Sequence, residues 1–266
     1  MKRIIFIVLS AVVLTLVPAS YACAQTGSVG KIETPKERKA RLEREAAAKK
    51  KKQQAAKKKW DFQGAFYEGL AEVMDANGKY GFIDKTGKVV IPCQWKWADS
   101  FSEGLAYVKD DNGRYGFIDK TGKVVIPCQW KDTYSFSEGL AVVEDANDKY
   151  GFIDKTGKVV IPCQWKGAWG FSEGLASVKD ANGKRGYIDK TGKVVIPCQW
   201  KGVDNFSEGL AGVVDANGKW GFIDKTGKVV IPCQWKDANS FREGQARVKD
   251  ADGKWHKIDK TGRIVE

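Results

Sequence analysis

Aromatic residues recur in connector segments where the chain otherwise varies. Trp97, Tyr134 and Trp169 lie in three successive connectors, between blocks of nearly identical sequence. Flat aromatic faces bind sugars, peptides and other ring-bearing ligands by stacking, and they also pack locally in loops. Both interpretations stay open from the sequence. The first predicts a ligand site at these three residues together with Tyr107, which occupies a variable strand position.

Other residues that could do chemistry occur in a pattern that argues against catalysis. Glu103 and Asp119 suggest an acid pair, but equivalents occur in all six copies of a repeat, and six identical active sites would be unusual. We expect Asp119 to cap backbone amides of a turn and Glu103 to be structural. His256, the one histidine, is expected to be a surface substitution. Phosphate-binding, dinucleotide and nucleophile-elbow motifs are missing, so we expect neither enzymatic activity nor a cofactor.

The cysteines beyond Cys23 occupy one position of the repeat. They are Cys93, Cys128, Cys163, Cys198 and Cys233. An odd number cannot all pair within one chain, and no Cys-x-x-Cys pair or histidine cluster accompanies them. The sequence favours small buried apolar side chains, with no disulfide and no metal site, and leaves their thiol state open.

The first 24 residues have the pattern of a cleaved secretory signal. Lys2 and Arg3 precede an apolar run over residues 4–17, and Ala22-Cys23-Ala24 forms an A-x-A cleavage site. Lipidation of Cys23 is the alternative, but Ser20 and Tyr21 do not fit a lipobox. We therefore expect a protein that is exported to the periplasm, the cell envelope or the extracellular space, with no transmembrane segment after cleavage.

Residues 25–59 form a basic tail. Residues 31–59 hold 13 basic and four acidic residues, and the leader adds two basic ones, so only +1 of the chain's formal +12 remains for residues 60–266. The high charge therefore predicts no specific nucleic-acid partner for the array. The tail is expected to be disordered or helical, and to act as a spacer or to contact an anionic surface electrostatically. The lysines that would make this contact are Lys49, Lys50, Lys51, Lys52, Lys57, Lys58 and Lys59.

Residues 60–266 repeat every 35 residues, six times. In the copy at residues 97–131, strands are expected at residues 106–110, 114–119 and 123–130, joined by turns at Asn112-Gly113 and Thr121-Gly122. Pro127 is expected on an edge strand or at a point where strand pairing ends. Alternation predicts a constant inner face at Ala106 and Val108 and a free outer face at Tyr107 and Lys109.

These units are predicted to be three-stranded antiparallel meanders of an all-β protein, and each is expected to need neighbours to bury its apolar face. Propeller blades usually have four strands and about 40–45 residues. We therefore predict an open superhelical array, with a closed six-bladed propeller-like ring as the alternative. The last copy, which contains Trp255 and His256, is expected to be a cap.

The repeated blocks resemble a known bacterial family. Phe-Ser-Glu-Gly-Leu-Ala, aromatic-Gly-Phe-Ile-Asp and Thr-Gly-Lys-Val-Val-Ile-Pro are similar to the WG repeat, whose namesake pair is Trp220-Gly221 here, although Arg185 departs from the aromatic position. The resemblance covers residues 60–266. It implies a β-rich repeat of bacterial, often exported, proteins, and it implies no catalytic residues and no particular ligand.

Two functions follow as expectations. The first is an exported, non-catalytic scaffold that binds an envelope protein or a glycan. The second is a structural envelope protein that self-associates through its array ends or its cysteines.

Overall fold

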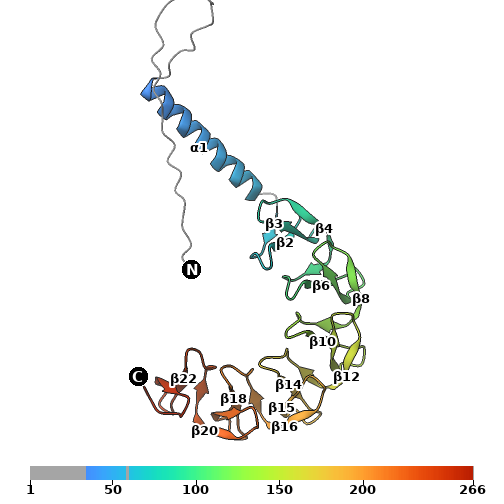
Figure 1. Cartoon of the computed structure of the whole chain (residues 1–266), viewed down its shortest axis with the longest axis vertical. Helices are drawn as coiled ribbons and strands as arrows, with labels where there is room; N and C mark the ends of the chain where they lie inside the picture. Colours follow the sequence, from blue (N-terminus) through green and yellow to red (C-terminus); the bar gives the residue numbers. More distant parts are fainter. Residues whose placement is uncertain (1–33, 58–59, 266) are drawn as a thin grey trace, which may run out of the picture. The chain divides into compact units, whose positions relative to one another are not determined.

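The computed structural model describes residues 34–57 and 60–265. The predicted leader at residues 1–24, including Cys23, lies outside these ranges, as do Lys58 and Lys59. The chain divides into two compact units, residues 1–51 and residues 52–266. The boundary between these units lies within the helix of the basic tail, Pro35–Lys57, ahead of the sheets (Figure 1).

The basic tail is helical over α1 (Pro35–Lys57). Thr34 caps it: the Glu37 carboxylate accepts a 2.8 Å hydrogen bond from the Thr34 N–H, and the Thr34 hydroxyl accepts one of 3.3 Å from the Glu37 N–H. This reciprocal capping box, with proline at the first helical position, starts the helix locally. The large apolar side chain of Leu42 is exposed, and the helix has no apolar stripe. Within residues 34–57 and 60–265, no helix has the length and apolar character needed to cross a membrane.

The array consists of six antiparallel sheets, each built from consecutive strands. Each of the first five has a two-residue strand, two central strands and a seven-residue outer strand. The first three sheets are β1 (Phe62–Gln63), β2 (Leu70–Met74), β3 (Tyr80–Asp84), β4 (Val89–Trp95); β5 (Trp97–Ala98), β6 (Leu105–Lys109), β7 (Tyr115–Asp119), β8 (Val124–Trp130); β9 (Asp132–Thr133), β10 (Leu140–Glu144), β11 (Tyr150–Asp154), β12 (Val159–Trp165).

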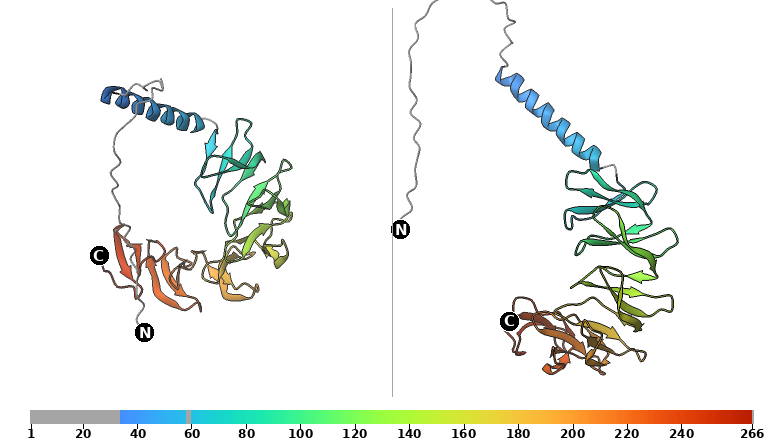
Figure 2. Two further views of the ribbon diagram at one scale, coloured as in Figure 1. Left: turned by 45° about the horizontal axis from the view of Figure 1, so that its top comes forward. Right: turned by 45° about the vertical axis from the view of Figure 1, so that its right-hand side comes forward.

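The remaining sheets follow the same pattern, except that the last has three strands. They are β13 (Gly167–Ala168), β14 (Ala176–Lys179), β15 (Arg185–Ile188), β16 (Val194–Trp200); β17 (Gly202–Val203), β18 (Leu210–Val214), β19 (Trp220–Asp224), β20 (Val229–Trp235); β21 (Asp237–Ala238), β22 (Gln245–Lys249), β23 (Trp255–Asp259). Successive sheets lie side by side in chain order (Figures 1 and 2).

The prediction of three strands per copy was wrong by one short strand. The connector pairs with the next strand over two residues, Trp97 opposite Lys109 and Ala98 opposite Val108. Two residues of variable type carry no alternation, so the sequence pattern could not reveal this strand. The three longer strands agree with the prediction to within a residue, and Pro127 lies on the outer edge strand as expected.

The predicted free outer face was also wrong, because both faces of an inner sheet are covered. Ala106 and Val108 pack with the preceding sheet in one apolar cluster. Leu105 and Phe117, on the opposite face, pack with Phe136 of the following sheet. A single copy cannot cover either face by itself, so stacking between copies supplies most of the burial.

Each joint between sheets is also held by a set of polar contacts that we call the glutamate clamp. The turn Ser102-Glu103-Gly104-Leu105 has positive φ at its two central residues, +53° at Glu103 and +89° at Gly104. From this turn, the Glu103 carboxylate accepts a hydrogen bond from the Gly139 N–H and forms an ion pair with Lys155, both at 3.0 Å. The same three groups recur at five successive joints, beginning with Glu68, Glu103, Glu138, Glu173 and Glu208.

The glycine after the aromatic residue is required by the close passage of the outer strand. A Cβ atom on Gly116 would lie 2.4 Å from the backbone oxygen of Ile126, and one on Gly221 would lie 2.6 Å from that of Ile231. Real Cβ atoms do not approach backbone atoms so closely. The last copy has His256 at this position, in a sheet with no outer strand of the usual length among the described residues.

The two ends of the array are covered in different ways. At the start, Trp60 packs on Ala71, Val73 and Ile83, the face that a preceding sheet would otherwise cover. At the other end, the outward face of the last sheet has Gln245 where the other copies have leucine. The strand β1 pairs with β2 of its own sheet, and the described residues show no sheet shared between the first and last copies.

Candidate binding edge

The positions at which the copies differ converge on one edge of each sheet. In the second copy these positions are Trp97, Asp99, Tyr107, Lys109 and Tyr115, and we call them and their equivalents the variable edge. Strand pairing brings them together: Trp97 lies opposite Lys109, and Lys109 lies opposite Tyr115. The Asp99 N–H donates to the Tyr107 carbonyl at 3.1 Å.

Trp97 is exposed at the start of this edge, with 44 % of its surface accessible. Its ring centroid lies 5.0 Å from that of Tyr80 in the preceding sheet, and Tyr80 lies 6.2 Å from Phe62. The first joint therefore carries three adjoining aromatic rings. Because Trp97 and Phe62 are exposed, they offer a ring surface to a ligand.

Tyr107 is half-buried in the joint between the second and third sheets. Its hydroxyl donates to the Asp99 carboxylate, and its ring lies 5.9 Å from Tyr115 and 6.4 Å from Phe117. Burial, followed by the Asp99 carboxylate, raises the pKa of Tyr107 well above its usual range. Tyr107 is thus a packed, hydrogen-bonded residue and not the fully accessible one that an outer face predicted.

Tyr134 and Trp169 lie at equivalent positions of neighbouring copies, and the structure brings them into one pocket of about 190 Å³. Trp97, one copy earlier and at a different position of its connector, does not line it. Tyr134 is 45 % exposed, and Trp169 is half-buried. A Cβ atom at Gly167 would lie 3.2 Å from the far end of the Trp169 ring, so glycine leaves room for the indole to fold back.

The third joint, between the third and fourth sheets, gives this pocket cationic as well as aromatic walls. The Arg185 guanidinium carbon lies 4.2 Å from the Trp169 ring centroid, a cation–π contact. Lys166 and Lys179 line the same pocket. The pocket has no acidic lining residue, so its described walls carry three positive charges.

The tyrosines of the pocket remain neutral hydrogen-bond donors near pH 7. Burial raises the pKa of Tyr150 to about 12, with a further contribution from the Glu144 carboxylate. Burial, then Asp132 and Glu144, also raises the pKa of Tyr134. A neutral phenol both donates and accepts, which suits a ligand rich in hydroxyl groups.

Sequence reasoning missed Tyr150, Lys166, Lys179 and Arg185 as pocket residues. The signal available was that Arg185 replaces an aromatic residue at a position where every other copy keeps one. The spacing alone could not show that this position adjoins Trp169, because the two residues meet only through the short strand that the pattern did not reveal.

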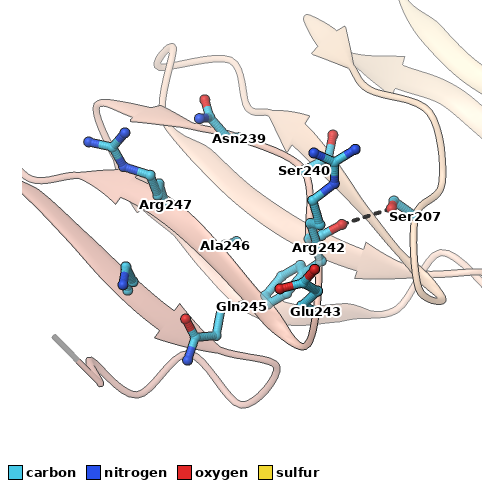
Figure 3. A pocket seen from close by; sticks show the side chains of 10 residues that line it. Ser207, Asn239, Ser240, Arg242, Glu243, Gln245, Ala246 and Arg247 are labelled. Carbon is cyan, nitrogen blue, oxygen red and sulfur yellow. Dashed lines mark hydrogen bonds between the residues drawn. The ribbon is translucent and has the colours of Figure 1, made fainter.

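A cavity of about 550 Å³ lies on the outward face of the last sheet (Figure 3). Arg242 and Arg247 lie on opposite sides of it, with Ala246 between them and Gln245 below both in this view. Lys257 lines it too, where other copies have phenylalanine or tyrosine. The Ser207 hydroxyl donates to the Phe241 carbonyl at 2.8 Å at its border. Polar residues at apolar positions are typical of a terminal capping repeat.

The structure confirms the role expected for Asp119 and corrects the one expected for His256. Asp119 Oδ1 accepts from the Thr121 hydroxyl at 2.6 Å and from the backbone N–H groups of Thr121 and Lys123 at 2.9 and 3.1 Å, which confirms its capping role. His256 is only 15 % exposed, and its Nε2 lies 2.6 Å from Asp250 Oδ2. It is therefore an internal partner of a turn and not a surface substitution.

All five array cysteines are half-buried, and Cys128, Cys163, Cys198 and Cys233 are free thiols. Burial raises the pKa of Cys128 and of Cys163 to about 11, and it raises the pKa of Cys198 and Cys233 as well. Thiolates are the reactive species, so these thiols are poor nucleophiles near pH 7. In the tail, Lys49 is exposed on α1, and Lys50, Lys51, Lys52 and Lys57 lie on the same helix.

Comparison with known proteins identifies the family to which the chain belongs. Among curated proteins, none matches the chain. Solved structures to which the chain is similar include the computationally designed Ika8 protein, 14 % identical with a TM-score of 0.48, covering 76 % of this chain and 71 % of that one. BamB from Moraxella catarrhalis is 14 % identical with a TM-score of 0.47, covering 77 % and 72 %. The WD40 beta propeller domain of Doa1 is 11 % identical with a TM-score of 0.39, covering 78 % and 85 %.

These similarities are too low to carry an argument about function. The family model described as WG containing repeat matches five times, at residues 80–113, 115–150, 150–184, 186–220 and 220–255. These segments cover more than half of the chain and agree with the period that the six sheets display. The chain therefore belongs to the WG containing repeat family.

Proposed function

We propose that this protein is an exported, non-catalytic scaffold that binds a glycan or a protein of the cell envelope along its variable edge. The observation that carries the proposal is the placement of the aromatic residues. Trp97, Tyr134 and Trp169 occupy the variable edge, while the buried positions between sheets stay nearly constant. Binding surfaces of repeat proteins are built from positions that differ between copies on a constant frame.

An open, superhelical arrangement of the sheets would make the edge continuous. The first and last described sheets share no strand, and Trp60 covers the starting face. The outward face of the last sheet carries Arg242, Gln245 and Lys257. A starting face covered by Trp60 and a polar last face give little support to the alternative of a structural protein that associates end to end. Half-buried thiols of raised pKa give little support to cross-linking through the cysteines.

The tail would act separately from the array. Its lysines, from Lys49 through Lys52 and again at Lys57 to Lys59, would contact an anionic surface through charge. Contact of this kind weakens as ionic strength rises, whereas stacking on aromatic rings depends much less on salt. Salt therefore separates the two contributions.

Co-sedimentation of the mature chain with cell-envelope fractions tests the proposal. One variant replaces the edge aromatics by residues found at equivalent positions of other copies: Trp97→Gly, Tyr134→Asn and Trp169→Asn. A second replaces Lys49, Lys50, Lys51 and Lys52 by Gln. We expect retention in high salt to be lost in the first variant and kept in the second. Retention that survives the three aromatic replacements at high salt would remove the edge as the binding site.

A further inference from the structure

We infer that the pocket at the third joint binds an acidic sugar, a hydroxyl-bearing ring with a carboxylate, within a glycan chain. This inference rests on the proposed function and names the class of ligand for one part of the variable edge. The pocket walls that define the site are Tyr134, Tyr150, Lys166, Trp169, Lys179 and Arg185.

The third joint is set apart by two substitutions within one copy. At the position of Arg185 the other copies have Tyr80, Tyr115, Tyr150, Trp220 and Trp255. At the position of Trp169, the third copy has Tyr134 and the remaining later copies have Asp or Asn. Arg185 is the one cation at a repeat position that is otherwise aromatic, and Trp169 is the one tryptophan at its own repeat position. The two side chains are in contact. Neither change is needed for packing, since five sheets assemble without it.

The three cations of the pocket have no directly paired acid, and Asp148 and Asp204 only feel the charge of Lys166 and Arg185 from nearby. Within residues 34–57 and 60–265, no ion pair engages Lys166, Lys179 or Arg185. By contrast, lysines at the clamp position, such as Lys155, are paired with glutamate. An anion would thus find three unpaired cationic donors in one small pocket.

The acids nearby are already engaged. Lys131 pairs with Glu144 at 3.3 Å and also with Asp148. Asp132 accepts a hydrogen bond from the Thr133 N–H at 2.9 Å. Asp204 lies near enough to Arg185 to feel its charge, but burial dominates and raises the pKa of Asp204 above its usual value.

The shape and polarity of the walls favour a sugar over a bare anion or an apolar group. Trp169 holds the Arg185 guanidinium against its face, which orients a planar fork suited to a carboxylate. The exposed Tyr134 ring offers a stacking surface, and two neutral phenols offer hydroxyl partners. Pockets for apolar ligands are lined mainly by hydrophobic side chains, which this one is not.

Calorimetric titration of the mature chain tests the inference, in a background with Lys49, Lys50, Lys51 and Lys52 replaced by Gln so that the tail contributes less charge. The probes are oligogalacturonate, its methyl ester and polyglutamate. Arg185→Tyr installs the residue found at Tyr150, and Trp169→Asn installs that of Asn239. Arg242→Ser, which installs the residue found at Ser207, is the control that removes one positive charge from the array outside the variable edge.

We expect oligogalacturonate to bind at least about tenfold more tightly than its ester, because a charge-assisted hydrogen bond is lost on esterification. Arg185→Tyr should remove most of this preference and leave weak binding of the ester unchanged, Trp169→Asn should weaken both, and Arg242→Ser should change neither. Equal binding of acid and ester, or an unaltered preference in Arg185→Tyr, would overturn the inference while leaving a neutral-glycan scaffold standing. Equal competition by polyglutamate would assign the pocket to acidic peptides instead. Binding of none of the probes would overturn the inference alone, since envelope co-sedimentation tests the scaffold separately.

Discussion

The carboxylate of Glu103 accepts a hydrogen bond of 3.0 Å from the backbone N–H of Gly139, 36 positions later in the chain. Glu103 makes this contact from a backbone with φ at +53°, a left-handed conformation that costs a non-glycine residue about 1–2 kcal/mol. The contact across the joint therefore has to offset a local strain. The contact links the turn of one copy to the turn of the next. The balance between its stabilising effect and the backbone strain can be measured.

Replacing Glu103 separates the strain from the contact. Glu103→Ala loses the hydrogen bond and the ion pair with Lys155 but keeps the strained backbone, so we expect it to destabilise the array by ~1–2 kcal/mol. Glu103→Gly loses the same contacts but relieves the strain, so it should be about 1 kcal/mol more stable than Glu103→Ala. Urea denaturation followed by tryptophan fluorescence measures both.

Glu243 supplies the matched control. It has the same turn conformation, with φ at +54°, but its side-chain carboxylate makes no clamp contact within the described part of the chain. Glu243→Gly should therefore be neutral or stabilising by up to about 1 kcal/mol. If it destabilised the array as much as Glu103→Gly does, the contribution of the clamp to the joint would be disproved.

The turn aspartates should make stability depend on acid pH. The Thr261 hydroxyl, followed by backbone N–H groups, lowers the pKa of Asp259 to about 2, and the equivalent aspartates of the other turns are lowered in the same way. A group whose pKa is depressed by folding stabilises the fold above its unfolded pKa, near 3.8 here, and loses that effect as pH falls through its folded pKa. We expect the urea midpoint to fall between about pH 4 and pH 2.

Asparagine keeps the acceptor oxygen of these turns but does not titrate. A variant with Asp119→Asn and Asp154→Asn should begin with a lower midpoint at pH 6 and lose less of it down to pH 2. If the urea midpoint fell equally with pH in this variant and in the parent chain, other carboxyl groups would control the acid transition.

The glycine that follows the aromatic residue should tolerate no side chain. Gly116→Ala would place a Cβ atom 2.4 Å from the Ile126 carbonyl oxygen, so the outer strand must move, and we expect a loss of ~2–3 kcal/mol. Gly170→Ala is the comparison, since the nearest atom there, Cβ of Ser137, is 3.6 Å away and φ is not positive. It should change the unfolding free energy by less than about 0.5 kcal/mol. Thermal melts of the two variants show whether the loss of stability comes from the clash with the outer strand or from any replacement of glycine by alanine.

The polar face of the last sheet should keep the array monomeric. Gln245→Leu with Lys257→Phe restores the residues that other copies use to receive a following sheet. We expect this double variant to associate with rising concentration in sedimentation velocity, because an exposed apolar face of this kind is covered by a neighbour elsewhere in the array. Lys123→Leu with Lys158→Phe adds similar apolar groups at the outer turns and should remain monomeric. A monomeric Gln245→Leu, Lys257→Phe chain would show that the polar residues are not needed as a cap.

The regular parts of the fold could be predicted from the sequence because the repeat reports them six times. The turn at Asn112-Gly113, the edge position of Pro127 and the capping role of Asp119 each follow from local chemistry, and the structure confirms them. The fourth strand could not be predicted, since Trp97-Ala98 is too short to show alternation.

The candidate site was predictable only in part, because sites at joints depend on how neighbouring copies meet. Tyr134 and Trp169 were identified from variation in the connectors, and they do share a pocket. Tyr107 was misplaced on a free face because alternation says which residues share a side but not whether a neighbour covers it. Arg185 was seen as an exception in the repeat, yet its contact with Trp169 is visible only in three dimensions.

The glutamate clamp also makes the number of copies adjustable. Every complete copy carries the glutamate for the joint ahead and the glycine and lysine for the joint behind, so an inserted unit of 35 residues would satisfy both of its new joints. Unequal recombination between such similar gene segments could therefore lengthen or shorten the protein without leaving a joint unpaired. Each such event would add or remove one position of the variable edge, so the reach of the protein and the assortment of side chains it presents can evolve by whole copies, ahead of any point substitution.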